Sequence, residues 1–208
     1  MRIKIISVIV LMGCMLIGCM QKEEAIEKPE QEEVSVYDAF LDKLRHHCGN
    51  AYEGRLTLEP PGDTMLDGDE LLIVHFRECQ DDRLKLPFHI ENLDGSWDRS
   101  RTWIFTRTET GLDIRHDHRK PDGSEDDFTM YGGPTHGVPT VNVMEFISHE
   151  RTEETGQYRG WRIIIEPDHR YVYGTFRDGE WSWRVDFDLT TPVDEPPAPW
   201  GHEKNEPL

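Results

Sequence analysis

Alternating apolar and polar residues run through most of the chain after residue 50, and this alternation restricts the fold more than any other feature of the sequence. Leu84, Leu86, Phe88 and Ile90 are separated by single residues of other kinds, and the apolar residues from Trp181 to Leu189 follow the same period of two. A strand that buries one face and exposes the other shows this pattern, which is typical of antiparallel sheets. The sequence therefore predicts an all-β fold.

About ten runs of this kind are separated by short turn sequences such as Asp122-Gly123 and Asp178-Gly179. Short links between consecutive strands predict a meander. Closing a sheet of this size into a barrel hides its edges, so we expect an antiparallel barrel. The expected strands span residues 51–58, 71–78, 84–91, 101–108, 111–119, 126–131, 141–147, 160–166, 170–177 and 181–189.

The register of the last hairpin also follows from its turn. With Asp178-Gly179 as a two-residue loop, Phe176 lies opposite Trp181 and Gly174 lies opposite Trp183. Both indoles then belong to the apolar face, and the glycine makes room for one of them. We therefore expect both tryptophans to point into the barrel.

A short helix is expected before the first strand. Ser35 can cap it, Asp38 stands at the capping-box position, and apolar residues then recur at helical spacing until the helix stops at Gly49. Residues 36–191 are interpreted as one barrel domain, and residues 192–208 as a Pro-rich C-terminal tail.

The N-terminus has the form of an export signal. A basic start, with Arg2 and Lys4, precedes an apolar stretch from Ile5 to Ile17, which is too short to span a bilayer as a helix. The stretch ends in Leu16-Ile17-Gly18-Cys19, which resembles the lipobox of bacterial lipoproteins. The resemblance implies that residues 1–18 are a signal peptide.

By the same resemblance, Cys19 becomes the first residue of the mature protein and carries a diacylglycerol, with further acylation of its amine. Several acyl chains suffice for stable membrane anchoring. Residues 19–35 are acidic and poor in apolar residues, and we interpret them as a disordered tether. Because Met20, rather than Asp, follows the cysteine, the expected location is the outer membrane, with the domain facing the periplasm or the cell exterior.

The charge balance argues against two classes of partner. The sequence has 41 Asp and Glu residues against 23 Lys and Arg, a formal net charge of −18. Such a surface repels nucleic acid and anionic lipid, so we expect neither as a partner. The charge favours solubility and a weak preference for cationic ligands.

The four cysteines divide into two groups. Cys14 leaves with the signal peptide, and Cys19 is the lipidation site implied above. Cys48 and Cys79 remain, in a compartment that is oxidising, and we predict that they form a disulfide.

The segment RHDHRKPDGSED, residues 115–126, is the strongest candidate for a functional site. With Pro121-Asp122-Gly123 as a three-residue loop, His118 faces Asp126 and His116 faces Phe128. The preceding hairpin brings two further residues alongside the histidines. The candidate ligand-binding cluster is Arg101, Trp103, His116, His118, Asp126 and Phe128.

Three interpretations of this cluster remain open. His116 and His118 could bind a metal ion with Asp126, as alternate histidines do in cupins, although the second cupin motif is absent. They could instead hydrogen-bond the polar end of an apolar guest in a small-molecule pocket. Alternatively, His118 pairs with Asp126, His116 packs on Trp103, and both histidines have only a structural role at the barrel rim. We identify no catalytic residue and no cofactor, and we do not expect an enzyme.

The expected architecture resembles the calycin group of barrels, which includes lipocalins and nitrobindin-like proteins. The stretches SRTW at 100–103, HDHRKPDGSED at 116–126 and TMYGG at 129–133 resemble those of uncharacterised bacterial lipoproteins and secreted proteins. The hypothesis is an envelope lipoprotein that binds a small apolar or amphipathic molecule. The alternatives are a structural or interaction module with a filled barrel and, more distantly, a metal-dependent cupin-like enzyme.

Overall fold

The computed structural model describes residues 34–66 and 68–203. The predicted signal peptide, Cys19 and the predicted tether up to residue 33 lie outside the described residues, so the lipobox interpretation stays a prediction. Within the described part of the chain, no helix has both the length and the apolar character needed to cross a bilayer.

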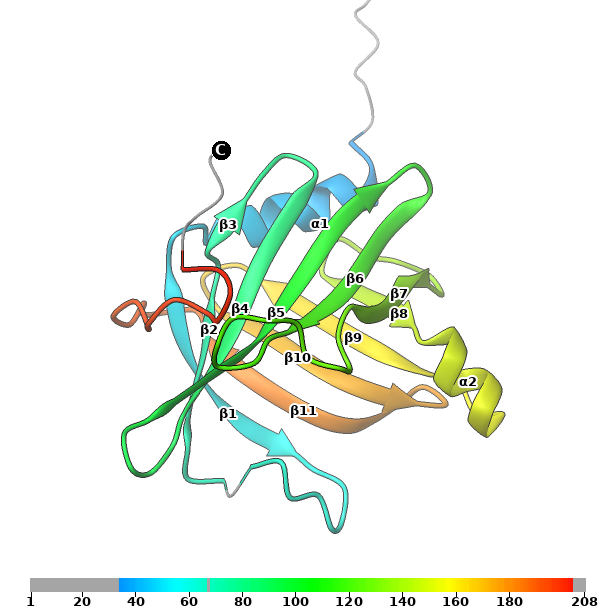
Figure 1. The fold of residues 1–208 in the computed structure, drawn as a ribbon. Helices are drawn as coiled ribbons and strands as arrows, with labels where there is room; N and C mark the ends of the chain where they lie inside the picture. The colour runs from blue at the N-terminus through cyan, green and yellow to red at the C-terminus, as the bar shows by residue number, and fades with distance from the viewer. Residues whose placement is uncertain (1–33, 67, 204–208) are drawn as a thin grey trace, which may run out of the picture. The chain divides into compact units, whose positions relative to one another are not determined.

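The fold is a closed antiparallel barrel, which confirms the predicted fold class (Figure 1). Ten strands form the barrel, each pairing with the next, and the pairings of β2 with β4 and of β1 with β11 complete the ring. This closed meander is compatible with a calycin-like barrel. The strands are β1 (Ala51–Leu58), β2 (Leu71–His75), β3 (Glu78–Cys79), β4 (Arg83–Glu91), β5 (Trp97–Thr108), β6 (Gly111–His118), β7 (Tyr131–His136), β8 (Val143–Ile147), β9 (Arg159–Glu166), β10 (Arg170–Arg177) and β11 (Glu180–Asp188), of which β3 pairs only with β4.

Period-two alternation places the expected side chains in the core. Leu84, Leu86, Phe88 and Ile90 all point inward and are buried. Closure between β1 and β11 depends on one glycine: a Cβ on Gly54 would lie 2.3 Å from the ring of Phe187, its partner across the strands. A bare backbone at this position lets the aromatic ring fill the interior.

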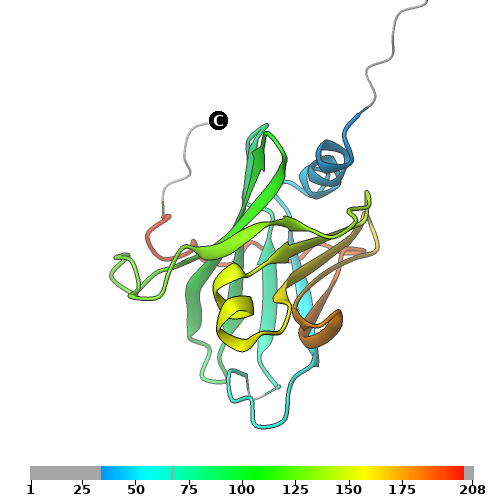
Figure 2. The ribbon, with the colours of Figure 1, turned by 90° about the vertical axis from the view of Figure 1, so that its right-hand side faces the viewer.

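Helix α1 (Val36–Arg45) closes one end of the barrel (Figures 1 and 2). The Ser35 hydroxyl caps it by accepting a hydrogen bond from the Tyr37 amide, at 3.3 Å. Asp38 does not complete a capping box in this structure, because its carboxylate accepts from Arg107 at 2.7 Å instead. The buried face of the helix belongs to the same core as the barrel interior and consists of Phe40, Leu41 and Leu44.

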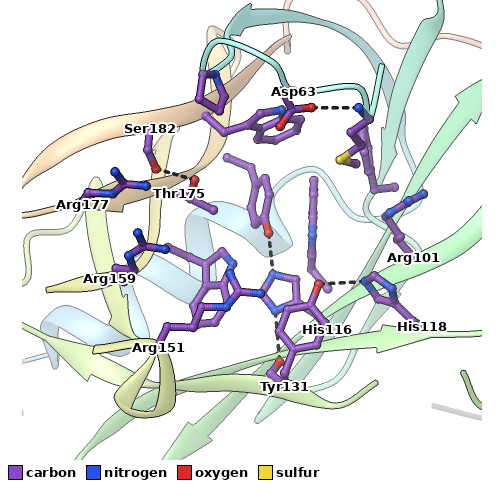
Figure 3. A pocket seen from close by; sticks show the side chains of 17 residues that line it. Asp63, Arg101, His116, His118, Tyr131, Arg151, Arg159, Thr175, Arg177 and Ser182 are labelled. Carbon is purple, nitrogen blue, oxygen red and sulfur yellow. Dashed lines mark hydrogen bonds between the residues drawn. The ribbon is translucent and has the colours of Figure 1, made fainter. Parts of the chain in front are cut away.

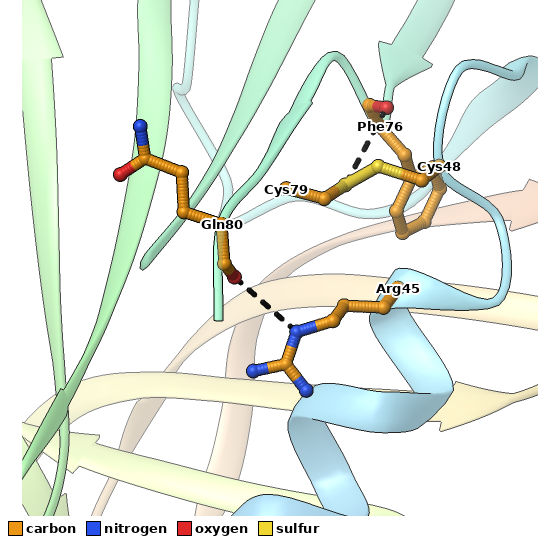
Figure 4. Close-up of a disulfide and its surroundings, with 5 residues drawn as sticks. All are labelled: Arg45, Cys48, Phe76, Cys79 and Gln80. Carbon is orange, nitrogen blue, oxygen red and sulfur yellow. Dashed lines mark hydrogen bonds between the residues drawn. A yellow bond between two sulfur atoms is a disulfide. The ribbon is translucent and has the colours of Figure 1, made fainter. Parts of the chain in front are cut away.

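The predicted disulfide is present between Cys48 and Cys79 (Figure 4). It joins the chain just after α1 to β3. Next to it, the Arg45 side chain donates to the Gln80 carbonyl at 3.3 Å. Helix α1 is therefore held to the strand region both covalently and by a hydrogen bond.

The expected strand at 126–131 is wrong. Residues 126–130 form bends, and β7 begins only at Tyr131. The His118 amide donates to the Thr129 hydroxyl at 2.7 Å, and Met130 adopts a left-handed backbone with a φ of 54°. A side chain thus takes the place of a backbone acceptor, and the regular ladder is interrupted here. Nearer the turn, Arg119 and Glu125 form an isolated antiparallel bridge, in the predicted register.

A bulge changes the register of the last hairpin. Phe176 lies opposite Trp181 as expected, but Trp183 lies opposite Thr175 rather than Gly174. An extra residue on one strand turns the following side chains to the other face. Trp183 therefore points inward, while Trp181 lies on the outer face, between the guanidinium groups of Arg162 and Arg184.

A second helix, α2 (His149–Thr155), has no counterpart among the expected elements. It has no buried residue and only seven residues, so it lacks the apolar periodicity that would indicate a helix. Its end signals are visible in the sequence: Ser148 accepts from the Arg151 amide, and Gly156 ends the helix with a φ of 69°. The helix packs beside β9 at the end of the barrel that α1 leaves open.

The described part of the C-terminal tail packs against the barrel. Val193 bridges to Ala51, the Trp200 amide donates to the Arg99 carbonyl at 3.1 Å, and His202 lies 2.7 Å from Asp117. The tail therefore contacts β1, β5 and β6, although its sequence has little apolar content.

Candidate functional site

A pocket of about 390 Å³ opens at the end of the barrel opposite α1 (Figure 3). Residues of the loop between β1 and β2, Arg151 of α2, and Arg177 at the end of β10 line the pocket. Six of the residues that line it are Phe, Tyr or Trp: Phe88, Trp103, Tyr131, Trp161, Tyr173 and Trp183. Four arginines also line it: Arg101, Arg151, Arg159 and Arg177.

The pairing of β5 with β6 follows the predicted register. Trp103 lies opposite His116, and Arg101 lies opposite His118. These four residues all line the pocket. Most of the candidate cluster is thus brought together as expected, on the inner face of two neighbouring strands.

Asp126 and Phe128, the other two candidate residues, do not line the pocket in the described structure. The side chain of Phe128 is 54% exposed and stacks on Tyr131, with ring centroids 4.5 Å apart. The Asp126 carboxylate accepts from the Phe128 amide at 3.3 Å. The Asp126 amide donates to the His118 carbonyl at 3.0 Å, so these two residues are backbone neighbours as predicted. The predicted pairing of His116 with Phe128 is wrong, because His116 lies opposite Tyr131.

His116 lies at the floor of the pocket and uses both ring nitrogens (Figure 3). Nδ1 lies 3.2 Å from the Tyr131 carbonyl oxygen, which can only accept, so Nδ1 carries the proton. Nε2 lies 2.5 Å from the Tyr173 hydroxyl and must accept from it. The lone pair that a metal ion would need is therefore occupied, which argues against the metal interpretation.

The side chain of His118 contacts Tyr131 rather than the carboxylate of Asp126. Its Nε2 lies 3.1 Å from the Tyr131 hydroxyl. Asp126 acts on it only as a nearby charge that raises its pKa, against larger opposing effects. The rim pairing of His118 with Asp126 is thus replaced by a histidine–tyrosine contact.

Burial keeps both imidazoles neutral at neutral pH. Loss of solvation lowers the pKa of His116 to about 3. Burial and then the charge of Arg101 lower the pKa of His118. The positive charge of the pocket at pH 7 therefore comes from its arginines.

Flat rings are layered across the pocket. Trp103 is stacked between Phe88, at a centroid distance of 5.2 Å, and Tyr173, at 3.9 Å. His116 stacks on Tyr131 at 4.7 Å with an interplanar angle of 3°. Such walls favour an apolar or aromatic guest, which gains contact area without losing hydrogen bonds.

Three of the arginines gather on one side of the mouth, and sequence reasoning missed all three. Arg151 extends from α2, and its guanidinium lies 5.5 Å from the ring centroid of Tyr131. Arg159 and Arg177 are direct partners across β9 and β10. In the described part of the chain, Asp63 is the only carboxylate that lines the pocket.

A second polar cluster lies at the α1 end. Side-chain donor atoms of His46, His47 and Asp168 lie within 4.8 Å of one another. The ring of His47 is already engaged, since Nδ1 lies 2.8 Å from the Tyr52 hydroxyl and Nε2 accepts from the Asp168 amide at 3.4 Å. The cluster satisfies its own polar groups, and we assign it no ligand.

Comparisons of the chain with protein-family models, with curated proteins and with solved structures give no match.

Proposed function

We propose that the barrel binds a small amphipathic molecule in the pocket opposite α1. The observation that carries this proposal is an unfilled volume of about 390 Å³ lined by stacked aromatic side chains. Known small-molecule sites have volumes of about 300–1,000 Å³ and similar apolar linings with a few polar groups. A guest of modest size therefore fits.

The rest of the interior limits the size of the guest. Toward α1 the barrel is filled by large buried side chains, among them Phe40, Phe76, Tyr171 and Phe187. Phe76 and Tyr171 contact each other there, with ring centroids 5.6 Å apart. A long acyl chain would have to displace these rings, so a compact guest is favoured over a fatty acid.

Filling the pocket should abolish binding. Thr175 lines the pocket, and its partner across β9 and β10 is Trp161, so a Thr175→Trp substitution puts an indole into the cavity. We expect at least a tenfold loss of affinity for the neutral fluorophore N-phenyl-1-naphthylamine, because the guest loses its contact area. Fluorescence titration measures the loss. The chain used carries Cys19→Ala, which keeps acyl chains and detergent out of the assay.

The matched control is Thr57→Trp. Thr57 is exposed, and its hydroxyl bonds Asp186 outside the pocket at 2.9 Å. This variant should bind the fluorophore as the parent chain does. Equal affinity of Thr175→Trp and the parent chain would contradict binding in this pocket.

We further propose that the domain is held at the cell envelope by the lipid on Cys19. The support is the sequence Leu16-Ile17-Gly18-Cys19 after a basic and apolar start. Cys19→Ala should move the protein from the membrane fraction to the soluble fraction or block its processing, because the acyl chains are the expected anchor. Fractionation with metabolic acyl labelling tests this. Wild-type protein without an acyl label would refute it.

A further inference from the structure

Three arginines at the pocket mouth differ from other arginines in the described part of the chain, because they have no carboxylate partner there. Arg162, on the same strand as Arg159, contacts Glu145 at 2.6 Å, and Arg170, on the same strand as Arg177, contacts Glu166 at 2.9 Å. Within the described residues, no ion pair is formed by Arg151, Arg159 or Arg177.

Their arrangement is unfavourable in the absence of an anion. Arg159 and Arg177 face each other across neighbouring strands, and like charges in this position destabilise a sheet. The Nε of Arg159 is buried and has no hydrogen-bond acceptor in the described structure. A buried donor without an acceptor costs free energy that a bound acceptor would recover.

A small recess of about 60 Å³ lies between these side chains. It is much smaller than the pocket of about 390 Å³ with which it shares Arg151, Arg159 and Arg177, so it suits a compact group rather than the body of a guest. Two hydroxyls also border it: Thr175 and Ser182 lie 2.8 Å apart. Since one hydroxyl must donate to the other, one hydroxyl proton is left to donate into the recess.

We infer that this recess binds a tetrahedral oxyanion, such as a phosphate, sulfate or sulfonate group, on Arg151, Arg159 and Arg177. The inference rests on the proposed function and adds the chemical class of the guest: a flat apolar body that carries an oxyanion. Guanidinium groups match oxyanions through paired N–H donors, and several of them can surround one tetrahedral group.

The overall charge of the protein does not oppose this site. The net charge of −18 repels anions at long range, but at physiological salt the field of exposed charges decays over about 8 Å. The three arginines act on a guest at contact distance. Among the described residues that line the pocket, one carboxylate, that of Asp63, opposes their positive charge. The weak preference for cationic ligands expected from composition thus does not extend to the pocket.

Two fluorophores with the same ring system test the inference. N-phenyl-1-naphthylamine is neutral, and 8-anilinonaphthalene-1-sulfonate adds one sulfonate to it. With the full chain carrying Cys19→Ala, we expect the sulfonate probe to bind at least tenfold more tightly than the neutral probe. Added salt should weaken the binding of the sulfonate probe and leave the binding of the neutral probe unchanged. Equal affinities for the two probes would overturn the inference.

Variants locate the effect. Arg159→Gln with Arg177→Gln should weaken sulfonate binding by about 10- to 100-fold, the range expected for lost hydrogen bonds to a charged group, while binding of the neutral probe changes less than twofold. Arg151→Gln, which alters α2 and leaves the barrel strands intact, should also lower the affinity for the sulfonate probe. The control is Arg170→Gln, on the same strand as Arg177 but outside the pocket, and it should change neither affinity.

The outcomes separate the two proposals. If neither probe binds, or if Thr175→Trp changes the affinity for neither probe, the proposed function fails. If the neutral probe binds and the sulfonate is insensitive to the arginine variants, only the oxyanion inference fails. Inorganic sulfate that competes with the sulfonate probe shows that the site also accepts a free oxyanion. If binding of the sulfonate probe depends on the arginines but inorganic sulfate cannot displace the probe, the site takes the oxyanion only as part of a larger guest.

Discussion

Lowering the pH from 7 to 5 should destabilise the folded barrel by about 2 kcal/mol for each of three buried histidines. Burial lowers the pKa of His75 to about 4, of His89 to about 3 and of His116 to about 3. All three imidazoles are almost completely buried. Two of them, His75 and His89, also have ring nitrogens without a hydrogen-bond partner in the described structure.

The direction of the effect follows from where the proton binds. Above pH 6.5 the histidines are neutral in both the folded and the unfolded chain, so their contribution to stability is fully present. As the pH falls below 6.5 the unfolded chain takes up protons that the folded chain cannot, and stability declines by about 1.4 kcal/mol per pH unit for each group. The decline continues until the folded pKa values near 3 to 4 are reached.

Urea unfolding at a series of pH values between 7.5 and 5 measures this slope. The range ends above the region in which most carboxylates titrate. A His89→Gln variant should reduce the slope by the share of one histidine, whatever its effect on stability at pH 7. Equal free energies of unfolding at pH 7 and pH 5 would show that these imidazoles are accessible to protons in the folded state.

Removal of the disulfide is expected to have the second largest effect. Cys48 and Cys79 are 31 positions apart, and in the chain-entropy model a loop of that length stabilises the fold by about 3–4 kcal/mol. Replacing both cysteines with alanine should lower the free energy of unfolding by that amount, measured in urea at pH 7. Native structure at the α1 end should be affected most, because the bond joins α1 to β3.

Reduction provides the control for this prediction. Dithiothreitol should destabilise the parent chain as much as the double substitution does, and it should leave the Cys48→Ala, Cys79→Ala variant unchanged. A loss of less than about 1 kcal/mol in both experiments would mean that the unfolded chain is already compact in this region.

Part of the candidate site could be predicted from local sequence. The pairing of Trp103 with His116 depends only on a short loop between two alternating strands, and it was predicted correctly. The pairing of His116 with Phe128 required regular strand geometry to continue through Asp126, and it was wrong. Whether a side chain such as Thr129 displaces a backbone acceptor depends on its three-dimensional surroundings, which a period-two pattern does not contain.

The arginine cluster was not recognised from the sequence. Arg151, Arg159 and Arg177 come from a helix without an apolar face and from the ends of two strands. In a chain with 23 basic residues, nothing in their local sequence distinguishes them from arginines that pair with carboxylates. Arg159 and Arg177 meet across the β9–β10 hairpin, and Arg151 joins them through α2, which was not among the expected elements.

The fold class, the closed meander, the helix before β1 and the pairing of Cys48 with Cys79 could all be predicted from the amino-acid sequence, because alternation, turn residues and cysteine count are local or compositional signals. That Trp183 points into the barrel while Trp181 lies outside it became clear only from the three-dimensional fold, since one bulged residue reverses the face of a strand. The same holds for an interior that is filled near α1 and open at the other end, because the packing of side chains from distant strands fixes which volume remains empty.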